Sequence, residues 1–175
     1  MPRIIITGGP GTGKSSLLAA LEQKGYPCFP EVSRIIIAEQ QATGGNLFPW
    51  GNISAFSKEC YVRMQAQLAD SFTDISFFDR GIPDIIAYLR RYGSAIPAVY
   101  FQAKEHYSST VLVCPPWPEI FCNDHQRPES FDETCLLNHH LCETYTAMGF
   151  SILEIPKVGI AERVDWVLKT IRNTL

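Results

Sequence analysis

The sequence lacks any long apolar run and any strong excess of one charge. Its longest apolar stretches, such as residues 3–7 and 109–114, have the length of a β-strand, far short of the roughly 18 to 20 residues that cross a bilayer. Lys and Arg number 15 against 18 Asp and Glu, a formal net charge of −3, so no overall field attracts nucleic acid or acidic lipid. The composition predicts a protein with no membrane span and no nucleic-acid partner.

The chain also lacks a secretory signal pattern and paired cysteine motifs. It reaches a glycine-rich stretch by Gly8, before any signal-length apolar segment, which predicts a cytoplasmic protein. Its six cysteines form no C-x-x-C pair and lie in mostly apolar surroundings, which favours reduced packing residues over a disulfide framework or zinc site. These cysteines are Cys28, Cys60, Cys114, Cys122, Cys135 and Cys142.

No repeat, low-complexity tract or linker divides the 175 residues, so we expect one domain spanning residues 1–175. Short apolar runs alternate with longer amphipathic stretches. The predicted strands are residues 3–7, 26–29, 75–78, 110–114 and 151–155; the first three predicted helices are residues 14–22, 32–41 and 53–71. Three more helices are expected after Pro83, after a capping box of Ser130 and Glu133, and over residues 160–175. This βαβα order predicts an α/β fold with a parallel sheet covered by helices on both faces, and ligands at the carboxyl ends of its strands.

Residues 8–15, Gly-Gly-Pro-Gly-Thr-Gly-Lys-Ser, fit the phosphate-loop pattern G-x-x-x-x-G-K-[ST] between a predicted strand and a predicted helix. Backbone N–H groups of such a loop converge on phosphate oxygens, and the helix N-terminus adds partial positive charge. We expect Lys14, exposed at the loop, to neutralise the β- and γ-phosphates of ATP, and the Ser15 hydroxyl to bind Mg²⁺. The predicted nucleotide-binding residues are Gly8, Gly9, Pro10, Gly11, Thr12, Gly13, Lys14, Ser15 and Ser16.

Several classes of phosphate-loop protein lack support in the sequence. Neither the N-K-x-D nor the D-x-x-G motif of GTPases is present, and L-S-G-G-Q of ABC-type ATPases is absent. A ring ATPase would carry an acidic pair after its third strand, where this chain has Asp79-Arg80. The remaining polar residues at strand ends must therefore indicate the chemistry.

Charged residues follow the second and third predicted strands. Near bound phosphate, Glu31 would orient the nucleophile or hold Mg²⁺ through water; the alternative is an exposed acid at a helix start. Asp79 would hold the Mg²⁺ shell, or cap the following helix instead. Arg80 would bind the acceptor or the transferring phosphate, and Arg34 would clamp an acceptor anion or pair with a surface carboxylate. Arg127 lies in a polar segment near 119–130 that predicts a lid, where it would stabilise the γ-phosphate, or else is an exposed loop residue.

Together the phosphate loop, Glu31, Arg34, Asp79-Arg80 and the Arg127 segment resemble the nucleoside and nucleotide kinases. Within that group the likeness is to the branch of predicted ATPases that includes the ribosylnicotinamide kinase domain of NAD-regulatory proteins. The resemblance implies a thymidylate-kinase-like sheet of five parallel strands and a lid that closes over ATP. It also implies that Glu31 takes the proton from the acceptor hydroxyl, and that residues 156–159 lie beside adenine unless they are an ordinary turn.

Aromatic and histidine residues outside these motifs are less specific. Phe48, Trp50, Phe56 and Tyr61 either stack on an acceptor ring or belong to the core. His139 and His140 lie in a predicted helix without Asp or Cys at ligand spacing, which predicts surface or packing roles.

The sequence therefore predicts a phosphotransferase that uses ATP and Mg²⁺ to phosphorylate a small nucleoside-like or nucleotide-like acceptor. Its catalytic residues would be Lys14, Glu31, Asp79, Arg80 and Arg127, with Ser15 and Asp79 holding the metal. The alternative is a regulatory ATPase, or nucleotide-dependent switch, that has no small-molecule acceptor.

Overall fold

Five parallel strands form the central sheet of the computed structural model, which describes residues 2–71, 75–122 and 129–174. The strands are β1 (Arg3–Thr7), β2 (Cys28–Phe29), β3 (Ser76–Asp79), β4 (Thr110–Val113) and β5 (Ser151–Glu154). Their order across the sheet is β2-β3-β1-β4-β5, and every neighbouring pair is parallel. The predicted α/β fold with five parallel strands is confirmed.

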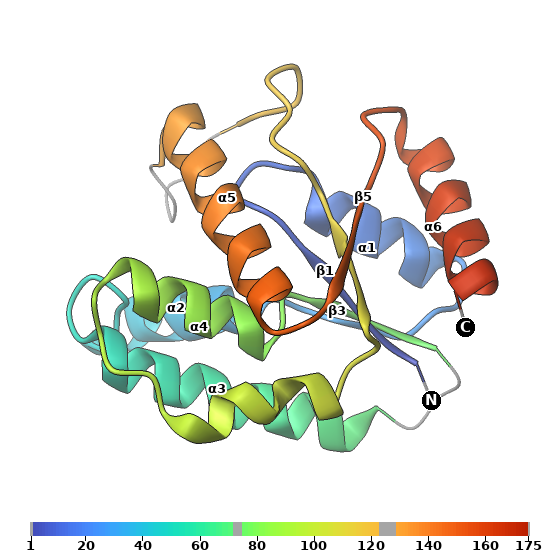
Figure 1. Cartoon of the computed structure of the whole chain (residues 1–175). Coiled ribbons are helices and arrows are strands. Elements are labelled where there is room, and N and C mark those ends of the chain that lie inside the picture. The colour runs from blue at the N-terminus through green and yellow to red at the C-terminus, as the bar shows by residue number, and fades with distance from the viewer. Residues whose placement is uncertain (1, 72–74, 123–128, 175) are drawn as a thin grey trace.

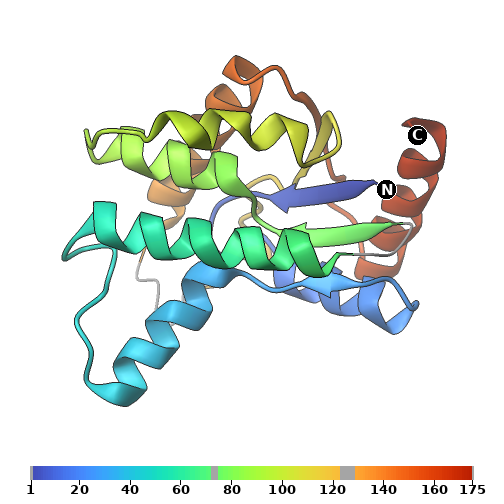
Figure 2. The ribbon, with the colours of Figure 1, turned by 90° about the horizontal axis from the view of Figure 1, so that it is seen from below.

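Helices cover both faces of this sheet (Figure 1). They are α1 (Lys14–Gln23), α2 (Val32–Thr43), α3 (Ile53–Asp70), α4 (Ile82–Arg91), α5 (Phe131–Ala147) and α6 (Ile160–Thr174), with a 3₁₀ helix, η1 (Ala98–Glu105), before β4. All but η1 lie where the sequence predicts a helix. Figure 2 shows α2 projecting away from the sheet and joined to α3 by a long loop.

Alternation along the strands creates two separate cores. Ile5 and Phe78 face a larger core built with α2, α3, α4, η1 and α5, whereas Ile6 and Phe77 face a smaller one built with α1 and α6. The central strands are apolar on both faces because both faces are covered, as parallel sheets require. This arrangement fixes the ends of β1 and β3, from which the site residues project.

Two helix starts are fixed by acidic side chains. At α5 the Ser130 side chain accepts from the Glu133 N–H at 3.2 Å, and the Glu133 carboxylate accepts from the Ser130 N–H at 2.7 Å. The predicted capping box is therefore confirmed. At α4 the carboxylate of Asp84 accepts from the Gly81 N–H at 2.9 Å, which satisfies a donor that the helix itself leaves unpaired.

None of the six cysteines forms a disulfide. Cys60 and Cys114 are buried, so burial raises the pKa of the Cys60 thiol to about 12. Cys122 is exposed, and the prediction of a packing role is wrong for it. Within the described ranges no helix is both long and apolar enough to span a membrane.

Candidate active site

The loop between β1 and α1 has the backbone of a phosphate cradle. Gly8, Gly11 and Gly13 have φ values of +140°, +69° and +80°, a region that side-chain-bearing residues rarely adopt. A Cβ atom on Gly8 would also lie 2.3 Å from the carbonyl oxygen of Cys114. Glycine is required at Gly8 both by its conformation and by the close approach of the chain after β4.

Lys14 is buried, so the prediction that it is exposed at the loop is wrong. Its side chain folds back over the loop, where Nζ donates to the carbonyl oxygens of Gly8 (3.0 Å) and Gly9 (2.8 Å). A buried ammonium group needs such acceptors, and the backbone of the preceding loop supplies them. Ser15 and Ser16, the next two residues of α1, are exposed.

Asp79 ends β3 next to this loop and is 5% exposed. Its Oδ1 atom is buried without a hydrogen-bond partner. Burial raises the pKa of Asp79 above its ordinary value, and the charge of Lys14 opposes that rise. The cap of α4 is formed by Asp84, so the alternative that Asp79 caps this helix is not what the structure shows.

A Mg²⁺ ion would find suitable oxygen ligands here. Ser15 offers a hydroxyl at the helix start and Asp79 an unbonded carboxylate oxygen, and Mg²⁺ prefers such oxygens while keeping several waters. Within the described residues no group of three or more His, Cys, Asp or Glu side chains gathers as a metal site. The residues present therefore fit an ion held mainly by water and phosphate.

Arg80 follows Asp79 and is locked in place by two carboxylates. Its φ of +72° is the only positive value for a non-glycine residue in the described chain, and its side chain is 3% exposed. Nε donates to Glu31 at 2.9 Å and Nη1 to Asp84 at 3.1 Å, while Nη2 has no partner. Such strain at a polar, buried position is typical of functional sites.

Glu31 lies at the N-terminus of α2 but is buried, 5% exposed, and its side chain does not cap the helix. Its carboxylate accepts from Arg80 and from the Ser33 hydroxyl (2.6 Å), and lies 3.7 Å from Nε of Arg34. The alternative of an exposed helix-start acid is therefore wrong. Arg34 pairs with this buried carboxylate instead of a surface one.

The sequence pattern does not single out Asp84, which links the parts of this site. Its carboxylate accepts hydrogen bonds from the Thr7 hydroxyl, Arg80 Nη1, the Gly81 N–H and the Tyr145 hydroxyl. Thr7 directly precedes the phosphate loop, so Asp84 joins that loop to Arg80 and to α5. Its place three residues after Gly81 is the one signal available, because that spacing is typical of an N-terminal cap.

A cavity of about 340 Å³ lies between α2, α3, α4 and the start of α5, with Arg80 and Asp84 in its wall. Trp50, Phe56, Tyr88 and Tyr92 are the aromatic residues that line it. Phe48 stacks on Trp50 with ring centroids 4.9 Å apart, whereas Tyr61 stacks on Tyr100 and does not line the cavity.

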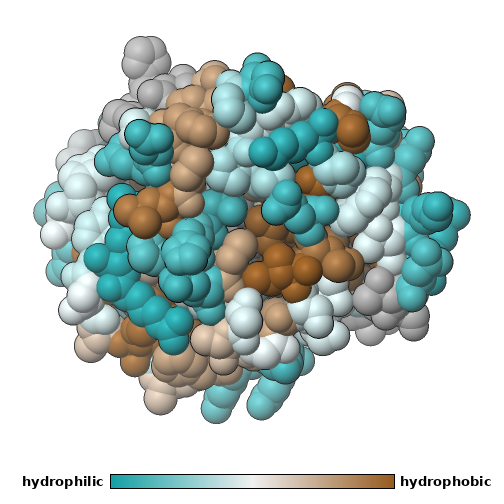
Figure 3. All heavy atoms as spheres, turned by 45° about the horizontal axis from the view of Figure 1, so that its top comes forward, coloured by the Kyte–Doolittle hydropathy of each residue, from teal (hydrophilic) through white to brown (hydrophobic). Residues whose placement is uncertain are grey.

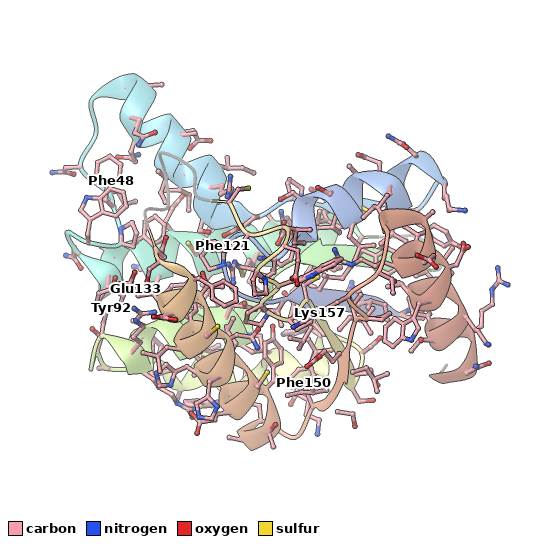
Figure 4. All side chains as sticks on the ribbon, turned by 90° about the horizontal axis from the view of Figure 1, so that it is seen from above. Phe48, Tyr92, Phe121, Glu133, Phe150 and Lys157 are labelled. Atoms are coloured by element: carbon pink, nitrogen blue, oxygen red, sulfur yellow. The ribbon has the colours of Figure 1, made fainter. Side chains whose placement is uncertain are left out.

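Two acidic residues, Glu133 on α5 and Glu129 just before that helix, complete the cavity wall. In the view from above, Glu133 and Tyr92 lie next to each other on the Phe48 side of the molecule, with Phe121 between that side and Lys157 (Figure 4). On the face that carries the loops, hydrophobic side chains gather near the middle, between hydrophilic ones (Figure 3). The cavity thus combines flat apolar walls with a few charged groups.

The first described part of the expected lid lies against the phosphate loop. A Cβ on Gly11 would meet the Phe121 ring at 2.8 Å, and Phe121 packs edge-on against Phe131 at 5.3 Å. Arg127 lies outside the described residues. His139 and His140 lie on α5, and their ring nitrogens are 3.2 and 3.5 Å from the carboxylate of Glu143. The side chain of His139 is 66% exposed, which fits the predicted surface role.

These features define a P-loop protein with the fold of the small-molecule kinases. The chain belongs to a family described as AAA domain, whose model matches residues 3–163. No curated protein matches it in sequence.

Solved structures show the same fold at low identity. Deoxyadenosine kinase from M. mycoides with bound dATP has a TM-score of 0.65 and 14% identity, over 98% of this chain and 100% of that one. Shikimate kinase from Aquifex aeolicus has 0.60 and 17%, over 98% and 96%. NadR protein in complex with NR has 0.69 and 14%, over 99% of this chain and 50% of that one, so the chain spans about half the length of NadR. The predicted likeness to P-loop kinases is confirmed at the level of the fold.

Proposed function

We propose that the protein is a small-molecule kinase that transfers a phosphoryl group from ATP, with Mg²⁺, to a hydroxyl of a nucleoside-like or nucleotide-like acceptor. One observation carries the proposal: Arg80 lines the cavity of about 340 Å³ and also donates a hydrogen bond to the carboxylate of Glu31. This arrangement lies at the same ends of the strands as the phosphate loop. Its volume and aromatic walls suit a small ring compound. The kinase names of several similar structures support the same reaction class.

Each residue has a role that follows from its place. Lys14, the first residue of α1, would stabilise charge on the transferring phosphate. Glu31 would accept the proton of the acceptor hydroxyl, because its carboxylate accepts hydrogen bonds from Ser33 and Arg80, which both line the cavity. Arg80, with one Nη group unbonded, would hold an acceptor or phosphate oxygen. When bound, Mg²⁺ supplies charge neutralisation between the phosphates, and Ser15 and Asp79 are the residues that would hold it.

The rest of the loop would bind ATP through its backbone and helix start. The residues concerned are Gly8, Gly9, Pro10, Gly11, Thr12, Gly13, Lys14, Ser15 and Ser16. We also propose that residues 1–175 act as one ATP-binding domain, and that the segment near 119–130 is a lid that carries Arg127.

The direct test is a panel of acceptors. Purified protein is incubated with ATP, Mg²⁺ and each of a set of nucleosides, nucleotides, nicotinamide riboside and shikimate, and ADP release is measured. Acceptor-dependent ADP release that disappears in Lys14→Ala protein supports the kinase. Slow ATP hydrolysis that no acceptor stimulates would favour the regulatory ATPase.

Asp79→Asn should weaken the binding of Mg²⁺ and stabilise the folded protein. Loss of a carboxylate from the ion's surroundings should raise the half-saturating Mg²⁺ concentration by about 10- to 100-fold. The pKa of Asp79 is raised by burial, so the folded state holds its proton more tightly than the unfolded chain does. Ionised Asp79 therefore costs stability, and that cost grows as pH rises above about 3.8.

Urea unfolding at two pH values measures this cost. At pH 8 the Asp79→Asn protein should unfold at higher urea than wild type, and the difference should shrink towards pH 4. Asp70→Asn, an exposed acid at the end of α3, is the matched control and should change neither quantity. An unchanged Mg²⁺ requirement in Asp79→Asn would remove Asp79 from the metal site.

A further inference from the structure

Arg163 on α6 reaches the phosphate loop from the opposite end of the sequence and is not part of the loop motif. It is 4% exposed, and its Nη2 lies 3.4 Å from the carbonyl oxygen of Thr12 and 3.0 Å from Sγ of Cys114. A Cβ atom on Gly13 would lie 2.8 Å from its Nη1. The guanidinium group is therefore packed against the residue that directly precedes Lys14.

The charge of Arg163 has no acidic partner in the described part of the chain. Its two hydrogen bonds go to a carbonyl oxygen and a thiol, and its Nε atom is buried with no partner at all. A buried cation without a carboxylate is costly, and proteins usually pair such groups. Lys14, only 5% exposed, adds a second buried positive charge at the same loop.

We infer that Arg163 is a nucleotide-binding residue, whose guanidinium adds to Lys14 the positive charge that a bound polyphosphate neutralises. The inference rests on the proposed nucleotide site and extends it to α6. A loop with two buried cations is matched in charge by a polyphosphate, which carries several negative charges. Arg suits the position because its planar group can brace the Thr12 carbonyl with one nitrogen and present others to an oxygen.

A merely structural role predicts a different outcome. If Arg163 served only to hold α6, β4 and the loop together, its removal would destabilise the protein and weaken every ligand alike. If it binds phosphate, replacement by an uncharged side chain of similar length should leave the ligand-free protein at least as stable, because an unpaired buried charge is lost. Stability and affinity would then change in different directions.

The experiment compares Arg163→Met, Arg163→Lys and wild type by calorimetric titration with ATP and with pyrophosphate, and by urea unfolding without ligand. Arg163→Met should bind both ligands about 10- to 100-fold more weakly, the range for loss of a charged hydrogen bond, with no fall in its urea midpoint. Arg163→Lys, which keeps the charge, should recover most of that affinity. Arg172→Met, an exposed residue of the same helix, should match wild type.

Three results would overturn the inference: unchanged affinity in Arg163→Met, a lowered urea midpoint in Arg163→Met, or Arg163→Lys binding as poorly as Arg163→Met. If Arg163→Met fails to fold, the comparison of Arg163→Lys with wild type still tests the inference. Arg163→Lys keeps the positive charge, so a fall of about 10- to 100-fold in its affinity for ATP and pyrophosphate would contradict a role for that charge. Wild-type protein that binds neither ligand would instead refute the nucleotide site itself.

Discussion

Phosphoryl transfer by Lys14→Ala protein should fall at least about 100-fold, because removal of one preorganised charged donor at a developing negative charge typically costs that much. The fold should survive. Nζ of Lys14 bonds the carbonyl oxygens of Gly8 and Gly9, which belong to its own loop and not to a distant element.

Turnover at saturating ATP and acceptor measures the first effect, and thermal unfolding measures the second. Lys24→Ala is the matched control, since Lys24 caps the other end of α1 and makes only a surface ion pair with Asp165 at 3.8 Å, a pair worth little. Turnover that stays at the wild-type rate in Lys14→Ala would end the assignment of the phosphate loop. A nucleotide found bound elsewhere would do the same.

The fold follows from local patterns to a large extent. The strands around Ile5, Phe77 and Leu112 are continuous apolar runs because helices cover both faces, and such runs are visible in the sequence. The edge strand β2 is shorter than predicted, Cys28–Phe29 instead of 26–29; Pro27 cannot donate to a strand ladder. The 3₁₀ helix at 98–105 carries no helical period that would predict it.

The site is less predictable because its contacts join distant parts of the chain. The loop motif predicts a phosphate-binding role for Lys14 but does not predict that its side chain is buried. Asp84 bonds Tyr145, 61 residues away, and Arg163 bonds Thr12, 151 residues away. No spacing in the sequence encodes either pair, so the roles of Asp84 and Arg163 emerge only from the folded structure. Those proposed for Glu31, Asp79 and Arg80 stay predictions.

Glu31→Gln should separate a kinase from a nucleotide switch. Glutamine keeps the size of Glu31 but cannot take a proton from an acceptor, so acceptor phosphorylation should fall about 100-fold, the scale of lost general-base catalysis. ATP affinity should stay within a few fold of wild type, because a residue that acts in the transfer step affects the rate more than ground-state binding.

The ion pair with Arg80 complicates this substitution and calls for two controls. Arg80 Nε bonds Glu31 at 2.9 Å, so glutamine replaces a charged acceptor by a neutral one, and urea unfolding must show how much stability is lost. Glu39→Gln is the same change near the other end of α2, where Glu39 pairs with Arg63 on the surface at 2.7 Å. It should leave phosphorylation and ATP binding as they are.

If no acceptor is phosphorylated and Glu31→Gln leaves slow ATP hydrolysis unchanged, the protein is a nucleotide switch. The phosphate loop would then stand without an acceptor site, and the cavity beside Arg80 would need another occupant.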